Sequence, residues 1–275
     1  MRVMKKSRSK SFSSSCPPVL TIAGSDPSGG AGIQADLKTF HQFGAYGMAA
    51  VSLLTIQNTL GVRKVHVLSP QKVKEQVQAV LDDITPLAAK TGALGSSAVI
   101  AAVGQMAARF LFPLVVDPVM VSKNGTWLMD PPACRTFIKH LLPHAYLVTP
   151  NVPEAVRISG MACKGSGSFR DMARKISGYG PRAVLIKGGH LKGEAVDYLY
   201  WQGEDHYFRA PRIKSAHSHG TGCTYSAAIA ALLARGRALD KAVKEAKAYV
   251  TRALSSSPHI GHGNGPINHF AKTGL

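Results

Sequence analysis

Short apolar runs alternate with amphipathic stretches along most of this 275-residue chain. The apolar runs lie at 19–23, 49–56, 114–117, 146–149 and 183–187. Most of them are continuous rather than alternating, which is typical of strands whose sheet is covered by helices on both faces. The stretches between them place apolar residues on one helix face, as with Ile33, Leu37 and Phe40. The pattern predicts a three-layer α/β/α fold with a central, mostly parallel sheet and helices on both faces.

Three further segments add to this prediction. Ser69 and Pro70 are expected to begin a helix, because serine caps helices and proline suits their first turn. The last long helix is expected at 239–254. Segments 195–201 and 206–210 alternate more strongly and predict an antiparallel hairpin at the edge of the sheet.

Composition limits the class of protein. Apolar residues make up 45% of the chain and charged residues 17%, which indicates one globular domain, placed at 19–275. No apolar run approaches the ~20 residues that cross a bilayer, so no membrane partner is expected. The net charge of +18 favours anionic ligands. The basic residues are scattered without interleaved aromatic residues, so no specific nucleic-acid partner is expected.

The segment 1–18 is basic and rich in serine, and it ends in two prolines. We interpret it as a flexible tail outside the fold, with an organelle transit peptide as the alternative; it lacks the apolar region of a secretory signal. Cys16, Cys134, Cys163 and Cys223 are widely spaced, which favours a reducing compartment, the cytoplasm.

Several strand exits carry polar residues, and ligands of parallel α/β sheets bind beyond these exits. The segment 24–32 has four glycines and either lets backbone approach a ligand or forms a flexible turn. Lys187 ends an apolar run, where it could neutralise phosphate charge or simply reach solvent. Asn151 and Glu154 could hold a hydrated Mg²⁺ over phosphates, or only cap a helix.

The segment 219–228 predicts an anion site at the start of a helix. Small residues at 227–234 favour a helix that Gly236 ends. Backbone N–H groups and the positive end of the helix dipole would converge near Gly222. Cys223 would lie there with its pKa lowered toward neutrality, ready to act as a base or a nucleophile, which suggests phosphoryl transfer. Taken alone, the segment is more typical of a tight turn with a small buried cysteine.

The histidines show no metal-ligand spacing. We interpret five of them as loop residues: His190, His219, His259, His262 and His269.

Seven segments together resemble one family. In order they lie at 23–36, 57–59, 117–120, 149–155, 187–190, 219–224 and 261–266. The set resembles the hydroxymethylpyrimidine/phosphomethylpyrimidine kinases of thiamine biosynthesis, and the resemblance extends from Val19 to Phe270. It implies a ribokinase-like fold, a homodimer, and ATP- and Mg²⁺-dependent phosphorylation of 4-amino-5-hydroxymethyl-2-methylpyrimidine and then of its monophosphate, to the pyrophosphate.

The resemblance also implies roles for individual residues. Gln57 would read the aminopyrimidine, which suits a carboxamide that both donates and accepts hydrogen bonds. The other residues on the substrate side would be Gly24, Asp36, Ala93 and Val119. The catalytic set would be Cys223 as proton acceptor, Gly220, Thr221 and Gly222 as the anion hole, and Lys187. The nucleotide would meet Asp117, Asn151, Glu154, Lys187 and Thr221, with Mg²⁺ held through water by Glu154 and Asn151.

One departure from the family keeps an alternative open. The family has Lys-x-Gly-Met-Leu where residues 90–94 read Lys-Thr-Gly-Ala-Leu. Ala93 would enlarge the pocket, so a pyridoxal/pyridoxine kinase is the first alternative, although Gln57 favours the pyrimidine. Tyr225, at a position where leucine is common, could refill part of the space. Two other classes remain: a cysteine hydrolase or acyltransferase, which would leave Lys187 unused, and a non-catalytic sensor that binds ATP without turnover.

Overall fold

The computed structural model describes residues 16–121, 125, 127–129, 131–189 and 193–274. His190 and most of the predicted tail lie outside these residues. Within the last residues of the predicted tail, Cys16 is exposed, whereas Pro17 and Pro18 are buried. The described chain therefore enters the fold at Pro17, slightly before the predicted boundary.

The centre of the molecule is a nine-stranded sheet with the order β3-β2-β1-β4-β5-β6-β7-β8-β9. Its strands are β1 (Pro18–Ser25), β2 (Tyr46–Asn58), β3 (Gly61–Val67), β4 (Ala88–Thr91), β5 (Leu114–Val116), β6 (Leu147–Val148), β7 (Ala183–Ile186), β8 (Ala195–Trp201) and β9 (Glu204–Ala210). The strands from β2 to β7 in this order are parallel, and β3, β8 and β9 pair antiparallel at the two edges.

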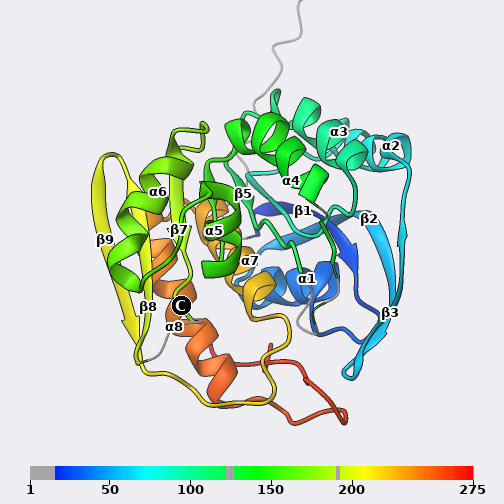
Figure 1. Cartoon of the computed structure of the whole chain (residues 1–275). Helices are drawn as coiled ribbons and strands as arrows, with labels where there is room; N and C mark the ends of the chain where they lie inside the picture. Colours follow the sequence, from blue (N-terminus) through cyan, green and yellow to red (C-terminus); the bar gives the residue numbers. More distant parts are fainter. Residues whose placement is uncertain (1–15, 122–124, 126, 130, 190–192, 275) are drawn as a thin grey trace, which may run out of the picture.

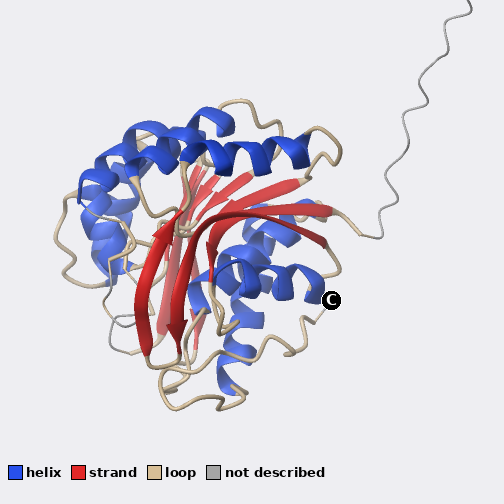
Figure 2. Ribbon diagram, turned by 90° about the vertical axis from the view of Figure 1, so that its right-hand side faces the viewer, coloured by secondary structure: helices blue, strands red, loops and turns tan. Residues whose placement is uncertain are grey.

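Helices cover both faces of the sheet (Figures 1 and 2). They are α1 (Gly32–Gln42), α2 (Pro70–Leu81), α3 (Ser97–Ala107), α4 (Pro131–Thr136), α5 (Val152–Ser159), α6 (Phe169–Ser177), α7 (Thr221–Ala234) and α8 (Leu239–Ser255), with short helical turns at Phe137–Leu141, Leu142–His144 and Ser166–Ser168. The predicted three-layer α/β/α fold is confirmed.

Alternate side chains of the central strands enter two separate cores, as the two-residue period of a strand requires. Leu20 and Ile22 of β1 pack in the core beneath α2, α3, α5 and α6. Val19 of the same strand packs in the opposite core, with α1, α7 and α8. Both faces of the central strands are therefore buried, which explains their uninterrupted apolar sequences.

The other expected elements are also present, with some additions. The Oγ of Ser69 caps α2 by accepting the N–H of Lys72 (3.3 Å), and β8 and β9 form the predicted edge hairpin. The sequence pattern did not predict β3, α3, α4 or α6. Within the described ranges, no helix is long and apolar enough to cross a membrane.

Candidate functional site

Helix α7 begins at the carboxyl edge of the sheet with several N–H groups unused by the helix. Gly220, which precedes it, has a φ of 80°, and a Cβ there would overlap the carbonyl oxygen of Gly30. The first helical bond runs from Thr224 N to Gly220 O (2.8 Å). The N–H groups of Gly222 and Cys223 therefore precede the helical ladder and can bind an anion.

Thr221, also expected in the anion hole, is directed differently. Its N–H and its hydroxyl both donate to the carbonyl oxygen of Ser218, over 3.3 and 2.6 Å. The Thr221 side chain thus stabilises the turn that leads into α7.

The ammonium group of Lys187 lies beside this helix start. Its Nζ is 2.9 Å from Oδ1 of Asp117, and a Cβ on Gly222 would lie 3.3 Å from the same Nζ. Burial alone would lower the pKa of Lys187, but the carboxylates of Asp117 and Glu154 raise it above its usual value. A positive charge is therefore held where the N–H groups of α7 converge.

Asn151 and Glu154 form a complete capping box at the start of α5. Oδ1 of Asn151 accepts the N–H of Glu154 (2.9 Å), and Oε2 of Glu154 accepts the N–H of Asn151 (2.8 Å). Oε1 of Glu154 also accepts the N–H of Met120 (3.4 Å). Burial raises the pKa of Glu154, although Lys187 acts in the opposite direction. The predicted capping box is thus present, and it leaves the Mg²⁺ role untested; among the described residues, no group of three or more potential metal ligands is found.

Cys223 lies at the predicted place, but the prediction of a lowered pKa is wrong. Burial, the largest cause, raises the pKa of this thiol to about 11. Lys90 and the N–H of Gly32 lower the value, while the carboxylates of Asp36 and Asp117 raise it further. The side chain is therefore a thiol at neutral pH.

Asp36 does not line a substrate pocket as expected, because it is fully buried. Its Oδ1 pairs with Nζ of Lys90 (2.6 Å), and its Oδ2 accepts the hydroxyl of Thr21 (2.7 Å). Lys90 is also fully buried, and its charge acts on Cys223. Asp36 therefore acts on the site through its charge, on Lys90 and on Cys223, and not by touching a ligand.

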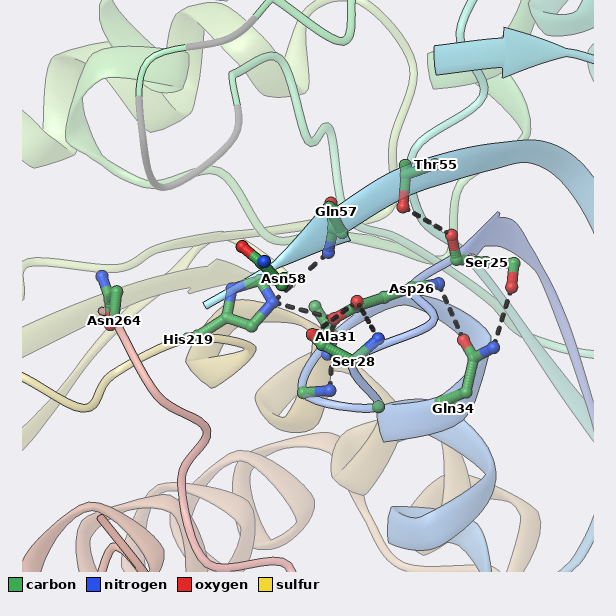
Figure 3. Close-up of polar contacts among 12 residues, drawn as sticks. Ser25, Asp26, Ser28, Ala31, Gln34, Thr55, Gln57, Asn58, His219 and Asn264 are labelled. Carbon is green, nitrogen blue, oxygen red and sulfur yellow. Dashed lines mark hydrogen bonds and ion pairs between the residues drawn. The ribbon is translucent and has the colours of Figure 1, made fainter. Parts of the chain in front are cut away.

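The glycine-rich loop at 24–32 is folded around the carboxylate of Asp26 (Figure 3). Oδ1 accepts the N–H (2.9 Å) and the hydroxyl (2.6 Å) of Ser28, and Oδ2 accepts the N–H groups of Gly30 (3.1 Å) and Ala31 (2.8 Å). These N–H groups face Asp26 rather than a ligand, and Gly24 itself is buried against Leu53. The loop is therefore held in one shape, not a flexible turn.

Asp26 also joins two distant segments of the chain (Figure 3). Its Oδ2 is 2.8 Å from Nε2 of His219, and Nε2 of Gln57, on β2, is 3.5 Å from the same imidazole nitrogen. Burial would raise the pKa of Asp26, but His219, the Ser28 hydroxyl and Gln57 together hold it well below its usual range. The sequence predicts only a loop histidine at His219, whereas the structure pairs it with Asp26. Its position directly before Gly220 is the one signal in the sequence that points to the site.

Ala93 and Val119 follow β4 and β5 at the same carboxyl edge, and both are partly exposed. The carbonyl oxygen of Ala93 accepts the hydroxyl of Ser52 (2.6 Å). Val119 has a φ of 22°, an unfavourable value for a β-branched residue. The Asp117-Pro118 turn therefore holds backbone strain next to the site.

Comparison with known proteins gives a consistent result. The family described as phosphomethylpyrimidine kinase matches residues 26–268. The chain belongs to this family. It is 44% identical to the hydroxymethylpyrimidine/phosphomethylpyrimidine kinase of Streptomyces coelicolor, over 92% of this chain and 94% of that protein. It is 46% identical to the thiamine biosynthesis bifunctional protein ThiED of Geobacter sulfurreducens, over 92% of this chain but about half (52%) of the relative.

Among solved structures, the pyridoxal kinase of Staphylococcus aureus in complex with AMP-PCP and pyridoxal superimposes with a TM-score of 0.85. The two chains are 35% identical, and the match covers 93% of this chain and 94% of the other. The predicted ribokinase-like fold, the predicted family and the prediction of a kinase are confirmed.

Proposed function

We propose that this phosphomethylpyrimidine kinase family member transfers the γ-phosphoryl group of ATP to the hydroxymethyl group of 4-amino-5-hydroxymethyl-2-methylpyrimidine, and then phosphorylates the resulting monophosphate, in thiamine biosynthesis. The names of its relatives support the substrate and the pathway. The observation that carries the proposal is the Lys187 ammonium, held by Asp117 beside Gly222 at the start of α7. A fixed cation and free N–H groups at one point suit a phosphoryl group in transfer.

Gln57 is proposed to read the pyrimidine. Its amide nitrogen donates to the carboxylate of Asp26 and lies 3.5 Å from Nε2 of His219, so its carbonyl oxygen remains to accept a hydrogen bond (Figure 3). The 4-amino group of the pyrimidine is a suitable donor for that oxygen. Ala93 and Val119, at the neighbouring strand exits, complete the proposed substrate side.

The reaction forms a bond between the hydroxymethyl oxygen and the γ-phosphorus while the bond to ADP breaks. We propose that the N–H groups of Gly222 and Cys223, together with Lys187, stabilise the charge of the transferring group. When Cys223 is a thiolate, its sulfur accepts the hydroxyl proton and becomes a thiol as the new bond forms. Because the pKa of Cys223 is about 11, only a small fraction is thiolate at neutral pH, and proton acceptance is the smaller contribution, ~10²-fold at the low end of general-base effects.

The nucleotide and its Mg²⁺ are proposed to lie over Asp117, Asn151 and Glu154. Both oxygens of Glu154 already accept backbone N–H groups, Oε2 from Asn151 and Oε1 from Met120, so direct coordination would cost these hydrogen bonds. The residues fit a hydrated ion that is held chiefly by nucleotide phosphates and reaches Glu154 through water. When bound, Mg²⁺ neutralises charge on the β- and γ-phosphates.

Pyridoxal kinase activity is the second candidate. Ala93 gives a roomier site than the methionine of the family pattern. The structural relative from Staphylococcus aureus is a pyridoxal kinase. The cysteine hydrolase and sensor alternatives lose their support, because the relatives are kinases and the Cys223 thiol is not activated.

A coupled assay of ADP formation tests the proposal, with the pyrimidine alcohol, its monophosphate and pyridoxal as substrates, each with and without Mg²⁺. Mg²⁺-dependent turnover of both pyrimidines is the expected result. Turnover of pyridoxal alone would establish the second candidate, and turnover of none would reject both.

For the assembly, we propose a homodimer, supported by exposed apolar side chains on β2 and β3: Tyr46, Leu54, Ile56 and Val67. We propose a cytoplasmic location, supported by four cysteines that are all free. The proposed partners are the two small substrates, with no specific nucleic acid and no membrane.

A further inference from the structure

His219 lies between the two parts of the proposed site. Its ring nitrogen Nε2 is 3.5 Å from the amide nitrogen of Gln57, the residue proposed to read the pyrimidine. The next residue, Gly220, opens the anion hole at the start of α7. A substrate that reaches from Gln57 to the N–H groups of α7 therefore passes the imidazole of His219. The side chain is 17% exposed, so it remains accessible to such a substrate.

Asp26 holds this imidazole in one orientation. The carboxylate is almost fully buried, and besides His219 it accepts N–H and O–H groups of its own loop. Because the carboxylate of Asp26 can only accept a hydrogen bond here, Nε2 of His219, 2.8 Å away, carries the proton of this pair. The ring also lies against Gly30. Within the described part of the chain, the second ring nitrogen, Nδ1, makes no hydrogen bond, so it can serve a ligand.

The proposed reaction sequence needs a group of this kind. The second substrate differs from the first by a phosphate, which carries close to two negative charges at neutral pH. Two lysines near Cys223 are already paired, Lys90 with Asp36 in the interior and Lys187 with Asp117 on the nucleotide side. An imidazole that carries a proton on both ring nitrogens donates a hydrogen bond at each of them.

We propose that His219, oriented by Asp26, binds the phosphate of the monophosphate substrate and thereby determines the second phosphorylation. This inference rests on the proposed function, because it assumes that the monophosphate enters the same site. His219 is then a specificity-determining residue whose side chain contacts the substrate phosphate. Asp26 is a positioning residue that acts through His219.

The test compares kcat/KM for the pyrimidine alcohol and for its monophosphate in the wild type, His219→Gln and His219→Asn. Loss of a hydrogen bond to a charged group lowers the ratio of monophosphate to alcohol by ~10–100-fold, mainly through KM for the monophosphate. Asp26→Asn is expected to lower the same ratio by less. His262→Gln, a matched change of an exposed histidine, leaves the ratio unaltered.

Binding of the monophosphate without ATP, measured by calorimetry, gives a second readout that does not depend on turnover. It should weaken in both His219 variants. Two results would overturn the inference while leaving the kinase function intact. One is an equal loss of kcat/KM for both substrates, and the other is an unaltered ratio of the two kcat/KM values together with unaltered binding of the monophosphate. If the wild type phosphorylates neither pyrimidine, the proposed function itself fails, and the two failures are thereby distinguished.

Discussion

At the scale of the residue, the protonation of Cys223 should be visible in its reactivity. Alkylation requires the thiolate, and the pKa of about 11 lies above the working range of pH. Below the pKa, the thiolate fraction rises about tenfold per pH unit. We therefore expect the rate of Cys223 alkylation by iodoacetamide to rise about tenfold per pH unit from about pH 7 to about pH 9.5. Mass spectrometry of the labelled peptide measures this rate.

The Cys223→Ala protein is the control, because it retains Cys16, Cys134 and Cys163 and shows their background labelling. A rate that levels off near pH 8 would mean that the helix N-terminus does activate the thiol. Burial would then not be the dominant influence on the pKa of Cys223.

Gly222 gives a second prediction at the same scale. In Gly222→Ala the new methyl group would lie 3.3 Å from Nζ of Lys187 and 3.6 Å from Oδ2 of Asp117, in the space proposed for the transferring phosphoryl group. We expect kcat/KM for the pyrimidine alcohol to fall by at least ~10-fold, or ~1.4 kcal/mol of transition-state stabilisation. Thermal stability should not fall, since alanine favours a helix more than glycine does.

Gly167→Ala is the matched control for this change, because a Cβ at Gly167 has no neighbour within 4 Å. Its kinetics should equal those of the wild type. Unaltered kinetics of Gly222→Ala would instead remove the anion hole from the start of α7.

At the scale of the element, a buried ion pair joins α8 to β8. Nζ of Lys247 lies 2.7 Å from Oδ2 of Asp197, whose Oδ1 accepts the N–H of Gly188 (3.0 Å). In Lys247→Met the carboxylate would stay buried without its cation, which typically costs about 3–5 kcal/mol. We expect a loss of this size in the free energy of unfolding, measured by urea denaturation.

Lys244→Met, an exposed change on the same helix, should alter the unfolding free energy by less than ~0.5 kcal/mol. A loss below ~1 kcal/mol in Lys247→Met would show that Asp197 becomes solvated or protonated when Lys247 is removed.

Elements that bury a whole face could be predicted from the sequence, and exposed ones could not. Val115 and Val116 of β5 enter opposite cores, so their strand is continuously apolar and was predicted. Strand β3 is mostly exposed and carries Arg63 and Lys64 among its valines, so neither burial nor a clear period marked it. Part of the site could be predicted in the same way, because the residues at strand exits follow from the order of the elements. The pairing of Asp26 with His219 could not, because it depends on a contact between residues 193 positions apart.

Local rules also misled where the tertiary environment was stronger. The N-terminus of α7 suggested a lowered pKa for Cys223, but burial and two nearby carboxylates reversed the direction. Asp36 looked like a substrate residue by resemblance, yet it pairs with Lys90 in the interior. Both errors concern charge balance among distant residues, which no short sequence window contains.

At the scale of the whole molecule, the sheet has two antiparallel edges of different character. The β3 edge lies beside an apolar surface formed by Leu54 and Ile56 of β2, which are 46% and 50% exposed. These residues alternate along β2 with Thr55 and Gln57, so they face away from the proposed substrate. An exposed strand edge with apolar side chains is a suitable surface for a second copy of the chain.

We therefore expect the wild type to be a dimer in sedimentation-equilibrium measurements. The double variant Leu54→Lys, Ile56→Lys should be a monomer, because burying two added charges on each copy would be costly. The control is Leu111→Lys, a fully exposed leucine between α3 and β5, which should remain a dimer. Since Gln57 is on the same strand, loss of the dimer should also raise KM for the pyrimidine alcohol if the partner keeps β2 in place. A wild type that sediments as a monomer, or a double variant that still dimerises, would place the interface elsewhere or remove it.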